Sequence, residues 1–188
     1  LYYGVYSSFR TFHGLLIQLG EHRSDIWAGG LTIETPTDNV RRLTQHDINP
    51  NTVPIGNWGN LYQLIDKVNT VIKLYPASPL SAYTRDKMLA EMYGLRAYLY
   101  YTLLKSWGRV PLTTEPVAGA SDLEALYRAG ATEQEVMAQI KSDIEQSLTL
   151  FNGVNTFTSK RVFWNRAASL TLKGDVYSWS ATLLNGGT

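Results

Sequence analysis

The sequence predicts a mainly α-helical fold built from antiparallel helix pairs. Five segments carry apolar residues at helical spacing, and no segment shows sustained strand-like alternation outside short stretches such as residues 30–35. In addition, Arg96 and Arg166, each followed by alanine, lie 70 positions apart in segments rich in small and aromatic residues. That separation is close to twice the 34-residue period of tetratricopeptide repeats, in which paired helices bury such apolar stripes against each other.

Two of the predicted helices precede residue 75. The first has one apolar face over residues 5–19, and the second has one over residues 58–72. Trp58 is in phase with the second face, which predicts that its indole belongs to the core. The residues of the two faces are Val5, Phe9, Phe12, Leu16 and Leu19, then Trp58, Leu61, Tyr62, Ile65, Val68, Asn69 and Ile72.

Three further helices follow. The third ends where Gly108 and Pro111 interrupt the pattern, and the fifth runs from about residue 164 to residue 184. The fourth begins at Thr132 with Glu135 three residues later, a capping box in which each side chain bonds a backbone N–H of the other residue. The apolar faces are Met88, Met92, Leu95, Leu99 and Leu103; Val136, Ile140, Ile144, Leu148 and Phe151; and Ala168, Leu172, Val176, Trp179 and Leu183.

Two long connections separate these helices. Residues 20–57 are rich in Gly, Asn, Thr, Pro and Asp, and residues 108–131 contain two prolines and three glycines. Loops of this length are uncommon in compact helical domains and often carry function. We therefore expect any binding chemistry to lie in the first connection.

The composition excludes several classes of protein. With 188 residues and 44% hydrophobic content, the chain is a folded domain or part of one. A net charge of +1 predicts no general attraction to nucleic acid or anionic lipid. The absence of cysteine excludes disulfides and thiolate metal sites, and no apolar run approaches the roughly 20 residues of a membrane span. No signal peptide begins the sequence, which starts inside a predicted helix and so suggests a piece of a longer protein.

No pattern of catalytic or metal-binding residues stands out, so we expect no metal and no cofactor. The three histidines lack metal-ligand spacing, and neither a nucleophile elbow nor a phosphate-binding glycine loop occurs. Residues 47–58 begin like a calcium loop but place Thr52 and Trp58 where glycine and glutamate are required. Paired carboxylates could serve glycoside hydrolysis, but no spacing rule selects a pair. The candidates are Glu21, Asp25, Glu34, Asp38 and Asp47.

The first long connection carries side chains suited to a sugar ring. Trp27 lies outside any apolar periodicity, which favours an exposed indole. A flat aromatic face stacks on the C–H face of a sugar, while amide, carboxylate and guanidinium groups bond its hydroxyls. The polar residues available for this are Asp25, Asn39, Arg41, Arg42 and Asn57.

Residues 90–112 resemble the signature helix of the SusD/RagB family. In that family an Arg-Ala-aromatic helix runs into a Gly-x-Val-Pro-Leu turn, as Arg96 to Leu112 does here. Three other segments are similar to the family in the same order: residues 58–72, residues 135–150, and residues 166–177 after a basic pair. The resemblance therefore extends over most of the chain.

The resemblance implies a non-catalytic, glycan-binding lipoprotein at the cell surface, on the outer membrane of Bacteroidetes. Members of the family cap a TonB-dependent, SusC-like transporter and pass oligosaccharide into it; their core consists of tetratricopeptide-like helix pairs with binding loops outside. Family chains are much longer and start with a lipid-anchoring cysteine that is absent here. Residues 1–188 then represent the N-terminal portion of a SusD-like helical domain, without its C-terminal half.

By analogy with the family, in which sugar contacts often precede the second helix, Asp25, Trp27, Arg42 and Asn57 are the predicted glycan-binding residues. Two alternatives stay open at this point. One is a helical-repeat scaffold that binds a peptide or protein on a concave face, and the other is a glycoside hydrolase. The identity of the glycan, and whether the cargo is instead a peptide, do not follow from the sequence.

Overall fold

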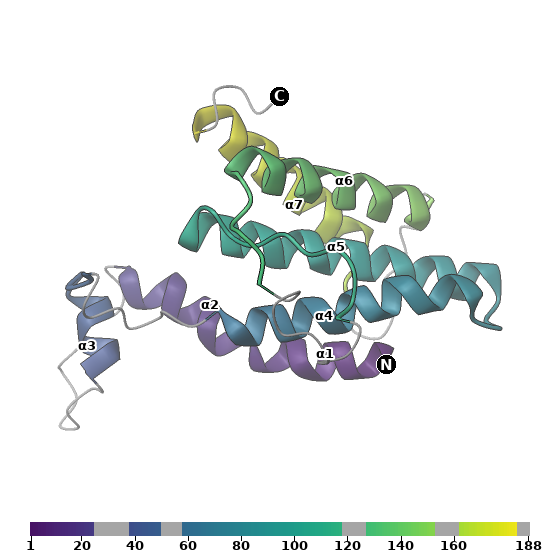
Figure 1. The fold of residues 1–188 in the computed structure, drawn as a ribbon, viewed down its shortest axis with the longest axis horizontal. Coiled ribbons are helices and arrows are strands. Elements are labelled where there is room, and N and C mark those ends of the chain that lie inside the picture. The colour runs from purple at the N-terminus through teal and green to yellow at the C-terminus, as the bar shows by residue number, and fades with distance from the viewer. Residues whose placement is uncertain (25–37, 50–57, 118–126, 153–161, 184–188) are drawn as a thin grey trace. The chain divides into compact units, whose positions relative to one another are not determined.

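A computed structural model describes residues 1–24, 38–49, 58–117, 127–152 and 162–183, without the side chains of 38–40 and 183. The described residues form helices and connections with no strand, which confirms the mainly α prediction (Figure 1). In chain order the elements are α1 (Tyr2–Thr11), α2 (His13–Leu19), η1 (Glu21–Arg23), α3 (Asp38–Thr44), α4 (Gly59–Leu74), η2 (Tyr75–Ala77), α5 (Ala82–Trp107), α6 (Glu133–Phe151) and α7 (Arg166–Leu183).

The chain divides into two compact units. The larger one comprises Leu1–Val5 and Gln63–Thr188, and the smaller one comprises Tyr6–Tyr62. Helices α1 and α4 each contribute residues to both units.

Helix α5 is the centre of the larger unit. It packs against α6 and α7, and α6 runs in the opposite direction to α5 (Figure 1). Most of its residues from Leu89 to Leu104 are buried on every side of the helix, because neighbours cover it all round. Ser81 caps its first turn by accepting from the Thr84 N–H at 3.3 Å, and it ends before Gly108, whose φ of 69° suits glycine.

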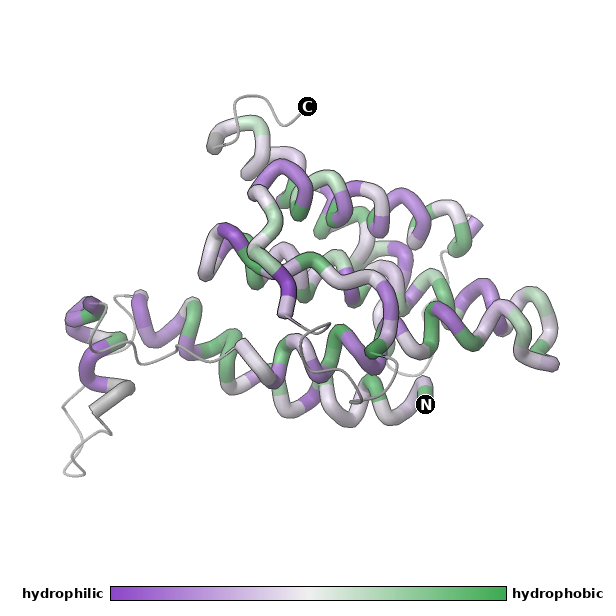
Figure 2. Tube along the Cα trace, viewed as in Figure 1, coloured by the Kyte–Doolittle hydropathy of each residue, from purple (hydrophilic) through white to green (hydrophobic). Residues whose placement is uncertain are grey.

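Helix α6 confirms the predicted capping box and apolar face. Thr132 Oγ1 accepts from the Glu135 N–H at 3.2 Å, and the Glu135 carboxylate accepts from the Thr132 N–H at 2.7 Å. Hydrophobic and hydrophilic residues alternate along α6 at helical spacing (Figure 2). The inward residues Val136, Ile140 and Ile144 have no exposed surface.

Removing this cap gives a first prediction. Replacing Thr132 by alanine is expected to lower the free energy of unfolding by about 1 kcal/mol, because the N–H of Glu135 loses its acceptor. Urea denaturation measures the change. The control Thr182→Ala alters an exposed threonine near the end of α7, and we expect a change below about 0.5 kcal/mol. An equal loss in both variants would contradict the capping assignment.

A chain of buried hydroxyls joins the elements around α5. Trp164 Nε1 donates to Ser169 Oγ at 2.8 Å, and Ser169 bonds Ser147 Oγ at 2.8 Å. Ser147 donates in turn to the carbonyl of Ala90 in α5 at 2.7 Å. The indole of Trp164 lies directly against Gly94 of α5, where the absence of a side chain leaves room for it.

The smaller unit departs from the sequence prediction in two places. The single helix expected over residues 5–19 is interrupted at Phe12, where the Phe12 N–H bonds the Phe9 carbonyl three residues back, so that the turn tightens. The connection expected over residues 20–57 contains η1 and α3, and η1 packs against both α2 and α3. Two arginines, Arg41 and Arg42, lie in the last turn of helix α3, where cations stabilise a helix dipole.

Candidate functional site

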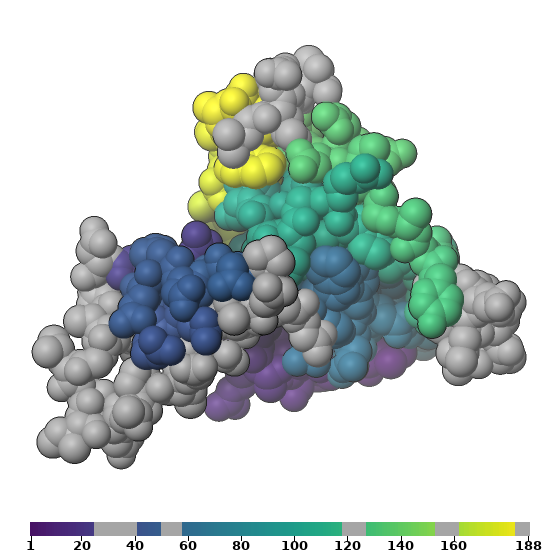
Figure 3. All heavy atoms as spheres, turned by 60° about the vertical axis from the view of Figure 1, so that its left-hand side comes forward, coloured from purple at the N-terminus to yellow at the C-terminus, as the bar shows by residue number. Residues whose placement is uncertain are grey.

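Arg42 is the predicted glycan-binding residue that the structure describes. It lies in the last turn of α3, in a region that forms part of the molecular surface (Figure 3). Its Nη1 donates to Asp47 Oδ2 at 2.9 Å, and the Asp47 N–H donates to the Arg42 carbonyl at 2.9 Å. His46 lies between them with a φ of 55°. Arg42 therefore closes the turn that ends α3, and the ion pair is partly exposed and weak.

Asp25, Trp27 and Asn57 lie outside the described residues. Their grouping with Arg42 as a sugar site stays a prediction from the sequence. Trp58, expected in the core, is half-buried just before α4, and its ring makes a T-shaped contact with that of Tyr62, with centroids 6.3 Å apart.

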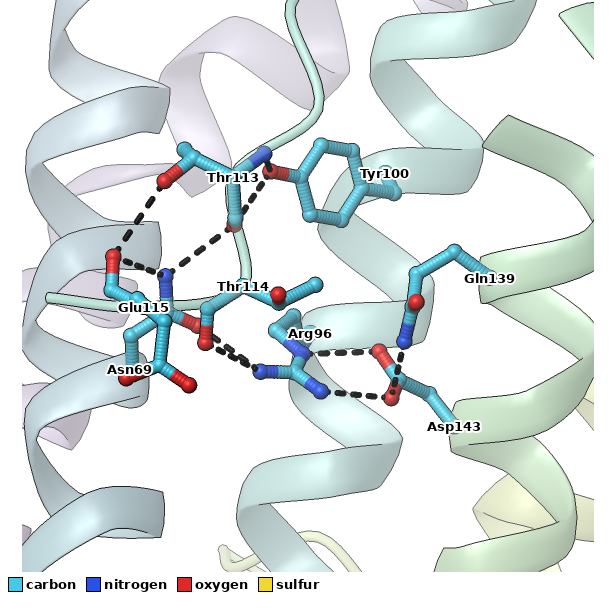
Figure 4. A network of polar contacts seen from close by, with 8 residues as sticks. All are labelled: Asn69, Arg96, Tyr100, Thr113, Thr114, Glu115, Gln139 and Asp143. Carbon is cyan, nitrogen blue, oxygen red and sulfur yellow. Dashed lines mark hydrogen bonds and ion pairs between the residues drawn. The ribbon is translucent and has the colours of Figure 1, made fainter. Parts of the chain in front are cut away.

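The most developed polar arrangement is a buried network around Arg96 of α5 (Figure 4). Arg96 Nε donates to Asp143 Oδ2 at 2.8 Å, and Arg96 Nη2 donates to Asp143 Oδ1 at 2.7 Å. Their side chains are only 5% and 1% exposed. This is the fork-like, two-bond geometry that a guanidinium makes with a carboxylate, and it joins α5 to α6.

Further donors and acceptors of this pair are also used. Arg96 Nη1 donates to Asn69 Oδ1 of α4 at 2.9 Å and to the Thr114 carbonyl at 3.1 Å. Gln139 Nε2 donates to Asp143 Oδ1 at 2.9 Å. A buried ion pair is tolerated only when its polar atoms are satisfied in this way.

The network holds the segment that follows α5. Tyr100 Oη donates to the Thr113 carbonyl at 2.7 Å and accepts from the Thr113 N–H at 2.8 Å. Asn69 Nδ2 donates to the carbonyls of Thr113 at 3.1 Å and Glu115 at 3.4 Å. The backbone of residues 113–115 is thereby bonded to side chains of α4 and α5 (Figure 4).

Further contacts extend this anchoring on both sides. The Val117 N–H donates to Asp66 Oδ1 at 2.8 Å, and Lys73 Nζ pairs with Glu115 at 3.0 Å. The Ala131 N–H donates to the Val110 carbonyl at 2.9 Å. Where the structure describes the connection 108–131, no helix or strand forms, and these bonds determine its path instead.

Burial and the ion pair together shift the pKa values of residues in the network. Burial lowers the pKa of Arg96, but the hydrogen bonds and charge of Asp143 outweigh it, so this pKa lies above its usual value and the group stays cationic. Burial raises the pKa of Asp143 above its usual value, and the bonds from Arg96 and Gln139 act against that shift. Burial also raises the pKa of Tyr100 to about 12, which keeps the phenol protonated and able to donate.

Comparison with known proteins identifies the family. The sequence profile of a SusD-like family, described as starch-binding and associating with the outer membrane, matches residues 32–177. The chain belongs to the SusD-like family. Its 143-residue match to the SusD-like protein P38 of Formosa agariphila is 32% identical and covers 74% of this chain but 27% of that protein.

Solved SusD-like structures share the fold. A SusD superfamily protein from Bacteroides vulgatus is 33% identical with a TM-score of 0.82, over 98% of this chain and 37% of the other. NanU of B. fragilis is 34% identical with a TM-score of 0.85, over 99% of this chain and 36% of the other. The SusD-like chain thus spans between 27% and 37% of the length of these relatives.

The sequence prediction missed the roles of Arg96 and Asp143 in this SusD-like chain. A signal was present, because Asn69 lies on the apolar face of its predicted helix and Asp143 directly precedes the inward Ile144. Arg96, Asp143 and Asn69 occupy buried positions on three helices, and their cation, carboxylate and amide can satisfy one another by hydrogen bonding. The sequence alone could not predict that these side chains pair, because 27 positions separate Asn69 from Arg96 and 47 separate Arg96 from Asp143.

The network around Arg96 has a structural role. The carboxylate of Asp143 is occupied by Arg96 and Gln139 and is 1% exposed, so it is not placed to exchange protons with a substrate. Within the described residues, no group of three or more histidine, aspartate or glutamate side chains could hold a metal ion. The network instead positions the connection between α5 and α6 on a rigid helical support.

Proposed function

We propose that the protein binds an oligosaccharide without catalysing a reaction on it and delivers this glycan to a SusC-like, TonB-dependent transporter at the cell surface. The observation that carries the proposal is the match of residues 32–177 to a family described as starch-binding and associating with the outer membrane. Two solved structures at 33% and 34% identity, one of them a SusD superfamily protein, are matched over nearly all of this chain and support the family membership on which the proposal rests.

The geometry is compatible with a binding role. Aromatic stacking and hydrogen bonds suffice to hold a sugar, and loops carried on a rigid scaffold are well suited to present such groups. The described part of the 108–131 connection is held by bonds from side chains of α4 and α5, so it is positioned before any ligand arrives. None of the described helices combines the length and hydropathy of a membrane span.

Isothermal titration of the full-length protein tests the proposal. The panel contains maltooligosaccharides, which represent starch, together with laminarin and other polysaccharides. We expect measurable affinity for at least one of them and no release of reducing sugar on prolonged incubation. Failure to bind any glycan would contradict the proposed function, and release of reducing sugar that is lost on changing Asp25 or Asp38 would favour a hydrolase.

The predicted loop site is tested separately from the function. Replacing Trp27 by alanine is expected to weaken glycan binding roughly tenfold, because one stacked aromatic ring accounts for about 1 kcal/mol or more. The matched variant Trp27→Phe keeps a flat ring and should retain most of the affinity. Equal binding by the alanine variant would reject Trp27 as the contact while leaving glycan binding intact.

A further inference from the structure

A cavity of about 250 Å³ opens at the N-terminal end of the larger unit. Three segments that are far apart in the sequence form it: the start of α1, the first turns of α5, and Phe163 ahead of α7. This cavity is separate from the Arg96 network. None of the four residues predicted to bind glycan lines it.

Four aromatic rings line the cavity. Tyr2 and Phe163 are stacked, with ring centroids 6.0 Å apart and planes within 17°. Tyr3 lies edge-on to Tyr2 at 5.2 Å. Tyr3 and Tyr83 are 71% and 62% exposed, so their rings are open to solvent at the rim. Single exposed aromatics are ordinary, but ligand pockets are lined mainly by hydrophobic and aromatic side chains, as this cavity is.

Polar groups complete the lining. The Tyr2 hydroxyl donates to the carboxylate of Glu91, a side chain with no exposed surface. Lys87 lines the cavity one helical turn before Glu91, and Thr84 adds a hydroxyl. The formal charges of Lys87 and Glu91 balance, which disfavours a strongly charged ligand and suits a neutral molecule with both C–H faces and hydroxyls.

We propose that this cavity binds one neutral pyranose unit of a glycan, with Tyr83 and Tyr3 stacking on the ring and the half-buried Lys87 and Thr84 bonding its hydroxyls. The inference rests on the proposed function and adds a second contact point outside residues 20–57. The volume lies just below the roughly 300–1,000 Å³ of sites for drug-sized ligands, which fits a single sugar ring better than a bound oligosaccharide. The open rim lets the rest of the glycan extend into solvent.

Titration of full-length wild-type and variant proteins with maltose, and with the disaccharide laminaribiose, tests the proposal. Short sugars are used because they report contact with single rings. Tyr83→Ala is expected to weaken binding of the preferred disaccharide five- to tenfold. Tyr83→Phe retains the ring and should stay within about twofold of the wild type. The matched control Tyr127→Ala removes a tyrosine that is 85% exposed and outside the cavity, and it should leave affinity unchanged.

The outcomes separate this inference from the function on which it rests. If the wild type binds a disaccharide and Tyr83→Ala binds it equally well, the cavity is not a sugar site, while glycan binding stands. If the wild type binds neither disaccharide, the cavity assignment is rejected, and if it binds no glycan at all, the proposed function is rejected as well. A loss of affinity in Tyr83→Ala together with a lowered unfolding midpoint would also count against the proposal, since 62% exposure predicts little effect of this change on stability.

Discussion

Replacing Arg96 by methionine is expected to lower the free energy of unfolding by about 3–5 kcal/mol. The variant leaves the carboxylate of Asp143 buried at 1% exposure without its cation. It also removes the hydrogen bonds that Asn69 and the Thr114 carbonyl receive from the guanidinium. Loss of one partner of a buried, hydrogen-bonded pair is costly because the other partner must stay desolvated. Urea denaturation followed by circular dichroism measures the effect.

A double variant distinguishes an isolated buried charge from a simple loss of packing. Arg96→Met combined with Asp143→Leu removes both charges, and we expect it to be more stable than Arg96→Met alone. Arg96→Lys serves as the conservative variant: it keeps the charge but not the two-bond fork, so an intermediate loss is expected. A loss below about 1 kcal/mol for Arg96→Met would contradict the central role given to this pair.

The second large effect is expected at Gly94, where alanine should destabilise the protein by about 1–3 kcal/mol. A Cβ placed on Gly94 would lie 2.0 Å from Nε1 of Trp164, well inside van der Waals contact. The indole cannot move away freely, because Nε1 donates to the buried Ser169 hydroxyl at 2.8 Å. The steric cost therefore outweighs the gain in helix propensity that alanine normally brings.

Gly174 is the matched control for this prediction. It lies in α7, is exposed, and has open space where the Cβ of an alanine would lie. Gly174→Ala should stabilise the protein by about 0.5–1 kcal/mol through helix propensity alone. Opposite signs for the two glycine-to-alanine changes in thermal or urea unfolding would support the packing argument. If Gly94→Ala instead stabilises the protein, the indole of Trp164 can shift away from residue 94 without an energetic penalty.

Most of the helical architecture was predictable because its signals are local. The apolar face of α6 and its capping box depend on residues three or four positions apart. The end of α5 at Gly108 and the extent of α4 are likewise indicated by neighbouring residues. The break at Phe12 and helix α3 were missed. Helix α3 has only seven residues, with two arginines in its last turn, and this is a weaker signal than a long apolar stripe. The polar composition of the segment favoured a loop instead.

The candidate sites were less accessible from the sequence. Of the four predicted glycan-binding residues, Arg42 is described, and it pairs with Asp47 five positions later; the grouping with Trp27 stays a prediction. No local sequence pattern indicates that Tyr2, Tyr83 and Phe163 line one cavity, because 81 positions separate the first two and 80 separate the last two. Such convergence depends on how helices pack, which single-sequence periodicity does not specify.

By itself, the sequence determined that this chain forms helices, where most of them begin and end, and which faces turn inward, because hydrogen bonding and amphipathicity act over one or two turns. It also carried the ordered motifs of the SusD-like family. Only the tertiary structure decided that Arg96 is paired with Asp143 and Asn69, that Gly94 accommodates Trp164, and that aromatic rings from three segments surround one cavity. Those contacts join residues distant in the chain, and their energies exist only once the helices have packed.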